Sequence, residues 1–200
     1  MESQQASSQV VNVPNALSTI RLLLAVVVGM LIELGEFLPA MIIFIIAAGT
    51  DFVDGWWARR FKQITKLGRM LDPFVDKIII TAALIALVGV AGSHVQAWMV
   101  TLIVGREFLV TSIRALVEGK GGDFSARWLG KLKMFFQCAA VVACLWMLHR
   151  PDSDTWLSWT AVALLWAAIA ITLASGVDYV LQAIKISRTV AENSSGLDRN

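Results

Sequence analysis

The sequence reads Asp51-Phe-Val-Asp54-Gly55-Trp-Trp-Ala58-Arg59 in one acidic segment and Gly68-Arg-Met-Leu-Asp72-Pro73-Phe-Val-Asp76 in a second. Long apolar runs flank both segments, and carboxylates at membrane depth are costly enough to indicate a function. The aspartates are spaced i, i+3 in the first segment and i, i+4 in the second, so each pair lies on one face of a helix. Two such faces together would form a cup of four carboxylates suited to divalent metal ions.

The composition is that of a polytopic membrane protein. The chain has 200 residues, is 57% hydrophobic and 16% charged, and contains four prolines. Its mean hydropathy is +0.68, far from the average of soluble domains. A net charge of +2 is too small to indicate a nucleic-acid partner. We therefore predict an all-α integral membrane fold.

Six apolar runs predict six transmembrane helices, at about 17–34, 37–57, 73–92, 95–117, 132–148 and 156–184. Each is close to the ~20 residues that a helix needs to cross a bilayer. Lys and Arg gather in the second-to-third and fourth-to-fifth connections. The positive-inside rule therefore predicts both termini, and the acidic cup, on the cytoplasmic side. We expect the third helix to begin near Asp72, because Pro73 suits the first turn of a helix.

The two ends of the chain are polar. We expect a disordered N-terminal tail at 1–10, one transmembrane domain at 11–186, and a cytoplasmic C-terminal tail at 187–200 that is disordered from Glu192. The first apolar run lacks the small-residue cleavage site of a signal peptide. Cys138 and Cys144 are six residues apart and do not share a helical face, so neither a disulfide nor a metal pair is expected.

The four aspartates are the candidate metal ligands. Hard cations such as Mg²⁺ bind carboxylate oxygens, and four acids suit two ions, either Mg²⁺ or Mn²⁺. Gly55 and Gly68 leave room for a ligand close to the backbone, and Arg59 suits a phosphate. The alternative is an interfacial salt-bridge network with nearby Lys and Arg. That network would explain one aspartate, but not four at this spacing beside two glycines and an arginine.

Eight residues of these segments match, without a gap, the signature of the CDP-alcohol phosphotransferase family: Asp51, Asp54, Gly55, Ala58, Arg59, Gly68, Asp72 and Asp76. The chain thus resembles integral membrane enzymes that move a phosphoalcohol group from a CDP-linked donor to an alcohol. The resemblance implies six transmembrane helices, two divalent metal ions and CMP as leaving group. It implies that Asp51 and Asp72 each contact both metals and that Asp54 completes the first site. Asp76 would contact the second metal and act as the general base.

The same resemblance implies a set of residues that bind the donor, CDP-diacylglycerol. They are Asn15, Thr19, Gly55, Ala58, Arg59, Thr65 and Gly68. Asn15 and Thr19 belong to the block at 13–21. This block and those at 105–114 and 128–133 resemble family members whose acceptor is sn-glycerol 3-phosphate. Because such members are commonly homodimers, a homodimer is expected, and the short chain suggests the bacterial cytoplasmic membrane.

Four cations predict a pocket for the phosphate of the acceptor: Arg106, Arg114, Lys131 and Lys133. Arg106 lies midway along a predicted span and Arg114 two turns later, so both are expected to face a polar cavity. A neutral acceptor such as inositol or serine would not need as many positive groups. The alternative is that Arg106 is structural, neutralised near Glu107 or by Asp178, and that Lys133 extends to the lipid headgroups.

Other functions remain open at this stage. An inositol-phosphate, serine or cardiolipin-forming transferase would share every donor residue and differ in the acceptor pocket. A transporter could also place acids in its spans, although the chain shows no pair of interrupted helices in related halves. A membrane scaffold would give no reason for the acidic cup.

Overall fold

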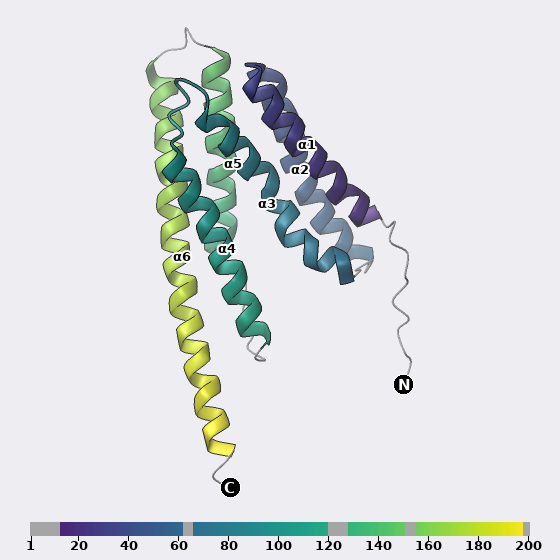
Figure 1. The fold of residues 1–200 in the computed structure, drawn as a ribbon, viewed down its shortest axis with the longest axis vertical. Coiled ribbons are helices and arrows are strands. Elements are labelled where there is room, and N and C mark those ends of the chain that lie inside the picture. Colours follow the sequence, from purple (N-terminus) through teal and green to yellow (C-terminus); the bar gives the residue numbers. More distant parts are fainter. Residues whose placement is uncertain (1–12, 62–65, 120–127, 151–154, 198–200) are drawn as a thin grey trace. The chain divides into compact units, whose positions relative to one another are not determined.

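The computed structural model describes residues 13–61, 66–119, 128–150 and 155–197, with side chains described at 19–49, 77–114, 130, 132–150, 155–184 and 186. All regular structure in these ranges is helical, which confirms the predicted all-α class (Figure 1). The helices are α1 (Val13–Glu33), α2 (Phe37–Phe61), α3 (Lys66–Val88), α4 (Ala97–Gly119), α5 (Trp128–His149) and α6 (Thr155–Leu197). Each contains most of one predicted apolar run.

The helices form two units. One comprises Met1–Val95 and Val141–Ser158, and the other comprises Gln96–Ala140 and Trp159–Asn200. The first unit therefore holds α1, α2, α3, the end of α5 and the start of α6. The second holds α4, the larger part of α5 and nearly all of α6.

In the first unit α1 packs against both α2 and α3, and α2 contacts α3. The buried side chains of α1 recur at helical spacing as Ala25, Val28 and Ile32, because residues three and four apart share one face. α2 and α3 present matching stripes, made of Ala40, Phe44 and Ala47 and of Ala83, Leu84 and Leu87. Alanines in each stripe allow the helix backbones to approach closely.

The opposite faces of these helices carry large apolar side chains that no protein atom covers. Leu23 on α1, Ile46 on α2 and Ile85 on α3 are 61%, 57% and 58% exposed. Soluble monomers rarely show apolar surfaces of this extent. In a bilayer the same side chains contact lipid, so the pattern suits a helix surrounded by hydrocarbon.

Two helical segments are long and apolar enough to cross a membrane by length and composition, Leu132–His149 and Thr155–Ile184. Phe37–Gly49 and Lys77–Val88 are apolar but shorter within the described side chains. Together with the exposed apolar faces, these segments indicate a membrane protein.

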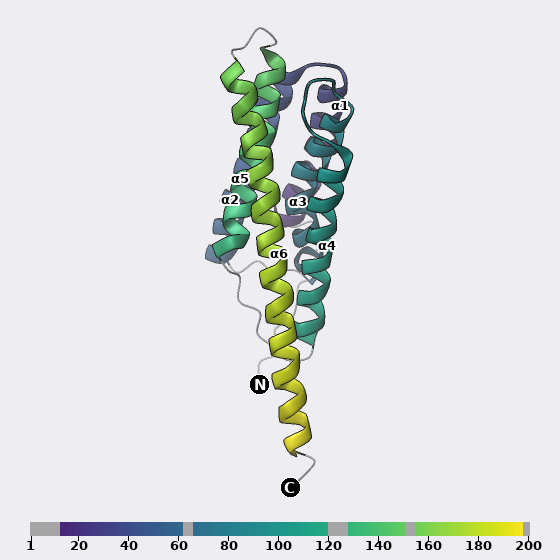
Figure 2. The same ribbon diagram turned by 90° about the vertical axis from the view of Figure 1, so that its left-hand side faces the viewer.

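In the second unit α4 and α6 lie side by side, and α6 continues past the C-terminal end of α4 (Figure 2). At 43 residues, α6 extends ~65 Å at the usual rise per residue. The helix runs to Leu197. The prediction of disorder from Glu192 is therefore wrong for residues 192–197. Extending a formed helix adds a backbone hydrogen bond for each residue fixed, which favours continuation beyond the apolar part.

The prediction that the third helix begins near Asp72 is also wrong. α3 begins at Lys66, so Pro73 lies inside the helix rather than in its first turn. A proline there removes one backbone hydrogen bond. Membrane helices tolerate that loss when neighbouring groups or a local adjustment of the backbone satisfy the freed carbonyl.

A glycine allows the tight connection between α1 and α2. Gly35 has φ +80°, a conformation that side chains with a Cβ rarely adopt. Its N–H donates to the carbonyl of Ile32 at 3.1 Å, and the N–H of Glu36 donates to the carbonyl of Leu31 at 2.8 Å. These bonds satisfy the last carbonyl groups of α1 and end the helix.

The packing of α1 on α3 generates the first prediction. Ala83 is 0% exposed, so Ala83→Leu should overpack the first unit and destabilise it by about 1–3 kcal/mol. Thermal unfolding in detergent measures the effect. Ile85→Ala is the matched control, since Ile85 is on the same helix but 58% exposed. Equal loss of stability in both variants would contradict the assigned faces.

Candidate functional site

The acidic segments lie on two helices of the first unit that contact each other. Asp51 and Asp54 belong to the last turns of α2, and Asp72 and Asp76 belong to the N-terminal half of α3. Their side chains lie outside the described residues, as do those of Asn15, Gly55, Ala58, Arg59 and Gly68, and Thr65 is not described at all. Thr19, on α1, is exposed. The metal-binding and donor-binding sets therefore remain predictions.

The four acids are chemically suited to the ions that the sequence predicts. Carboxylate oxygens from two adjoining helices are the donor set that Mg²⁺ and Mn²⁺ prefer. Among the side chains that the structure does describe, no group of three His, Cys, Asp or Glu residues could hold a metal. The acidic segments are thus the candidate metal site.

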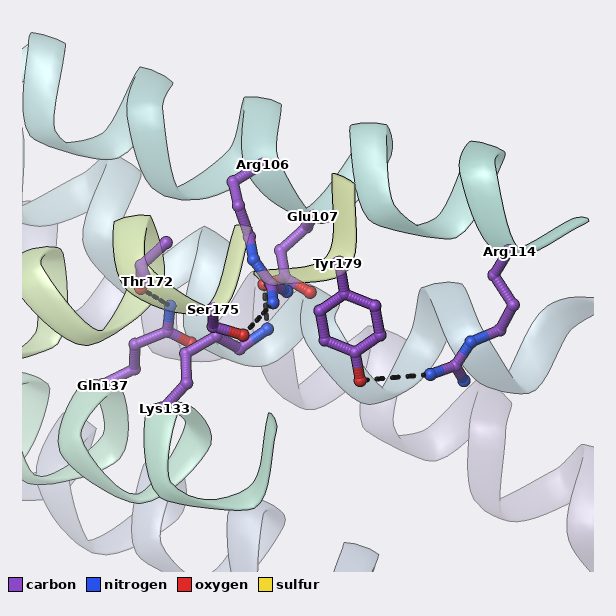
Figure 3. Close-up of polar contacts among 8 residues, drawn as sticks. All are labelled: Arg106, Glu107, Arg114, Lys133, Gln137, Thr172, Ser175 and Tyr179. Carbon is purple, nitrogen blue, oxygen red and sulfur yellow. Dashed lines mark hydrogen bonds and ion pairs between the residues drawn. The ribbon is translucent and has the colours of Figure 1, made fainter. Parts of the chain in front are cut away.

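A buried ion-pair cluster connects α4 to α5 in the second unit (Figure 3). The Oε1 atom of Glu107 accepts a hydrogen bond from Nη1 of Arg106 at 3.1 Å and a second from Nζ of Lys133. All three residues are at most 9% exposed. Charges buried in this way are costly unless they are paired, so the carboxylate stabilises both cations at the same time.

Two further hydrogen bonds connect this cluster to α6. Nη2 of Arg106 donates to Oγ of Ser175, and one turn away Nε2 of Gln137 on α5 donates to Oγ1 of Thr172 at 3.2 Å. Both acceptors are 0% exposed. Helices α4, α5 and α6 therefore share one polar interior within the second unit.

Arg114 reaches the same interior from the C-terminal half of α4. Its Nη2 donates to the hydroxyl of Tyr179 at 3.4 Å, and its guanidinium carbon lies 5.9 Å from the centre of the tyrosine ring. Arg106 contacts the same ring at 5.3 Å. The two arginines that the sequence places two turns apart are thus joined through one aromatic side chain.

Cations are grouped among the described side chains of this interior. Arg106, Arg114 and Lys133 are cations, and Glu107 is a carboxylate that contacts two of them. Lys131, the fourth predicted cation, has a side chain outside the described residues. Grouped cations suit an anion such as a phosphate, which can accept several charge-assisted hydrogen bonds.

The structure shows which acid pairs with Arg106. Arg106 forms an ion pair with Glu107, while Asp178 accepts a hydrogen bond from Gln182 at 2.9 Å. The assignment of Arg106 to the acceptor pocket stays a prediction. Lys133 is 6% exposed, so its side chain does not extend to a lipid headgroup.

Sequence reasoning missed most of the polar groups around these cations. Gln137, Ser175 and Tyr179 were not predicted to belong to the site, and Glu107 was named only in the structural alternative for Arg106. A signal was present on α6, because Thr172, Ser175 and Tyr179 recur at helical spacing within an apolar segment and therefore share one face.

An apolar cleft of about 530 Å³ lies beside Arg106, between α4 and α6. Its walls include Leu102 and Leu109 from α4 and Leu173 and Val177 from α6. Its mostly apolar lining is suited to hydrocarbon rather than to a polar ligand.

Known proteins are similar to this chain over most of its length. The model of the CDP-alcohol phosphatidyltransferase family matches residues 11–175. A CDP-diacylglycerol–glycerol-3-phosphate 3-phosphatidyltransferase of Bacillus subtilis is 42% identical over 142 residues, covering 71% of this chain and 72% of the relative. The protein of that name from Escherichia coli K12 is 33% identical over 178 residues, covering 84% and 93%. This chain therefore belongs to the CDP-alcohol phosphatidyltransferase family.

Proposed function

We propose that this protein transfers the phosphatidyl group of CDP-diacylglycerol to sn-glycerol 3-phosphate and releases CMP, which is phosphatidylglycerophosphate synthase activity in phospholipid biosynthesis. The observation that carries the proposal is the similarity, at 33–42% identity over most of the chain, to relatives named for this reaction. The complete eight-residue signature in 51–76 supports it.

The donor side of the proposal rests on the acidic segments. Asp51, Asp54, Asp72 and Asp76 would hold two Mg²⁺ or Mn²⁺ ions, whose charge neutralises the pyrophosphate of the donor. Arg59 suits the phosphates of the same group because a guanidinium binds two phosphate oxygens together. Asn15, Thr19, Gly55, Ala58, Thr65 and Gly68 complete the proposed donor set.

The reaction then needs one proton acceptor. A hydroxyl oxygen of the acceptor forms a bond to the phosphorus that carries diacylglycerol, and the bond from that phosphorus to the CMP oxygen breaks. The hydroxyl proton passes to the carboxylate of Asp76, which is the general base of this scheme. CMP leaves with the bonding electron pair, so atoms and charges balance.

The acceptor side rests on the cationic interior of the second unit. Arg106, Arg114, Lys131 and Lys133 would bind the phosphate of glycerol 3-phosphate. The three of these cations whose side chains are described are held by one carboxylate and one aromatic ring. A group of cations favours a phosphorylated acceptor over a neutral one such as serine.

The membrane arrangement extends the same proposal. All six helices would cross the cytoplasmic membrane of a bacterium, with both termini and the acidic segments on the cytoplasmic side. The family match at 11–175 supports a single transmembrane domain at 11–186. Small buried residues such as Ala25 and Ala83 permit close helix packing, and a homodimer is proposed on the family pattern.

An acceptor panel tests the reaction itself. Purified protein with CDP-diacylglycerol and Mg²⁺ should release CMP with sn-glycerol 3-phosphate, and little with glycerol, serine or inositol. EDTA should abolish the release, and added Mg²⁺ or Mn²⁺ should restore it. Chromatographic measurement of CMP decides the matter. Release with serine but not with glycerol 3-phosphate would refute the proposed acceptor.

Removing the proposed base gives a second test. Asp76→Asn should lower kcat by about 10²- to 10⁴-fold, because proton transfer is lost, with a much smaller change in affinity for CDP-diacylglycerol. Equilibrium binding of the donor separates the two effects. Glu36→Gln is the control, since Glu36 is an exposed acid in the connection between α1 and α2. A fully active Asp76→Asn protein would exclude Asp76 as the base.

The acceptor pocket has its own test. Lys133→Met should raise KM for glycerol 3-phosphate by about 10- to 100-fold, because a charge-assisted hydrogen bond to the phosphate is lost. The KM for CDP-diacylglycerol should stay unchanged. Arg150→Gln serves as control, because Arg150 is an exposed cation that contacts the ring of Trp146. Parallel increases in both KM values would count against an acceptor-specific role.

A further inference from the structure

Tyr179 is the point at which the two arginines of α4 meet. The guanidinium carbons of Arg106 and Arg114 lie 5.3 and 5.9 Å from the centre of its ring, both within the range of cation–π attraction. The ring comes from α6 and lies between the two side chains (Figure 3). One aromatic side chain thus contacts two of the three described cations of the proposed acceptor pocket.

The two arginines need such a common support because of their separation along α4. Arg114 is eight positions after Arg106, which is ~12 Å along a helix axis. Each guanidinium is at the end of a long side chain with many rotamers. A neighbour that contacts both guanidinium groups can set their relative orientation.

The ring is well placed to act as that neighbour, because it is itself fixed. Tyr179 is 4% exposed and packs with Val110, with Ile113, Ala183 and Ile186 around them. Its hydroxyl accepts the hydrogen bond from Arg114. The orientation of the ring is therefore set by apolar packing on one side and by a polar contact on the other.

Two glycines leave the space that this arrangement uses. A Cβ atom at Gly176 would come within 3.2 Å of Cγ of Arg106, and one at Gly130 would come within 3.6 Å of the Tyr179 hydroxyl oxygen. The first distance is closer than an ordinary contact, so a larger residue at 176 would displace Arg106. The backbone of α6 thus lets Arg106 lie against it beside the ring.

An aromatic ring suits this position better than an acid would. A carboxylate at 179 would neutralise the arginines and compete with a phosphate for them, as an anion pairs directly with a guanidinium. The face of a tyrosine ring attracts cations while adding no net charge. The ring therefore contacts both arginines without neutralising either of them. Glu107 differs in this respect, since it pairs ionically with Arg106 and Lys133.

We propose that Tyr179 is a positioning residue of the acceptor pocket: its ring and hydroxyl hold Arg106 and Arg114 in the orientation that binds the phosphate of the acceptor. The inference rests on the proposed function, because it assigns these arginines to the acceptor rather than to the donor. It adds a residue whose effect is specific for the phosphorylated substrate.

Steady-state kinetics of three variants test the role. Tyr179→Leu, which removes the ring, should raise KM for sn-glycerol 3-phosphate about tenfold and leave KM for CDP-diacylglycerol unchanged. Tyr179→Phe retains the ring and should raise the KM for sn-glycerol 3-phosphate less than about threefold. Leu165→Ala is the structural control, since Leu165 is a buried residue of the same helix. It should lower thermal stability without changing either KM.

A spectroscopic measurement covers the case in which Tyr179→Leu does not fold. Tyr179 is the only tyrosine in the chain, so 3-fluorotyrosine gives a single ¹⁹F resonance. In full-length protein in micelles, sn-glycerol 3-phosphate should shift this resonance, and glycerol at the same concentration should not.

The outcomes separate the inference from the function on which it rests. If wild-type protein releases CMP with glycerol 3-phosphate, but Tyr179→Leu keeps the wild-type KM, the role of Tyr179 is overturned and the function stands. If the ¹⁹F resonance does not shift at a saturating concentration of sn-glycerol 3-phosphate, the role of Tyr179 is likewise overturned. If wild-type protein uses no phosphorylated acceptor, the proposed function is refuted, and the role of Tyr179 is refuted with it.

Discussion

The shared carboxylate of Glu107 is the interaction on which the second unit depends. Arg106 and Lys133 are both nearly inaccessible, and a buried cation without a partner costs several kcal/mol even after the protein relaxes around it. Glu107 pairs with both, so a single acid makes it possible to place two cations between helices. The same pairing joins α4 to α5, while the contact of Arg106 with Ser175 joins α4 to α6. Ion pairs and hydrogen bonds thus fix how these helices are oriented toward one another. Apolar side chains in a lipid environment cannot supply such directional interactions.

The two units use different kinds of interaction because their residues have different tasks. In the first, apolar stripes such as Ala25, Val28 and Ile32 pack α1 against its neighbours. This apolar packing supports α2 and α3, which carry the acidic segments. In the second, the buried stripe of each helix includes charged or hydroxyl side chains. The first unit thus contains the helices that carry the proposed metal ligands, and the second contains the cations that we propose bind an anion.

The sequence predicted part of this organisation and missed part of it, for physical reasons. Apolar runs near the length of a membrane span gave the helices, and Arg106 and Lys133 were recognised because ions in such runs are costly. The helix start at Asp72 was wrong, because the sequence alone does not tell whether a proline begins a helix or lies within it. Tyr179 was missed because a tyrosine in an apolar segment resembles any packing aromatic, and its contact with Arg114 joins residues 65 positions apart.

What the sequence determined by itself was the chemistry and the class: an all-helical chain, the family signature at 51–76 and a supply of cations for an anionic substrate. These follow from local composition and spacing, since the periodicity of a helix places residues three and four apart on one face. Only the tertiary structure decided which groups meet. It paired Lys133 with Glu107 rather than with a lipid headgroup, and it brought two arginines of α4 against one ring of α6. Such contacts depend on how whole helices pack, and no local pattern in the chain specifies that.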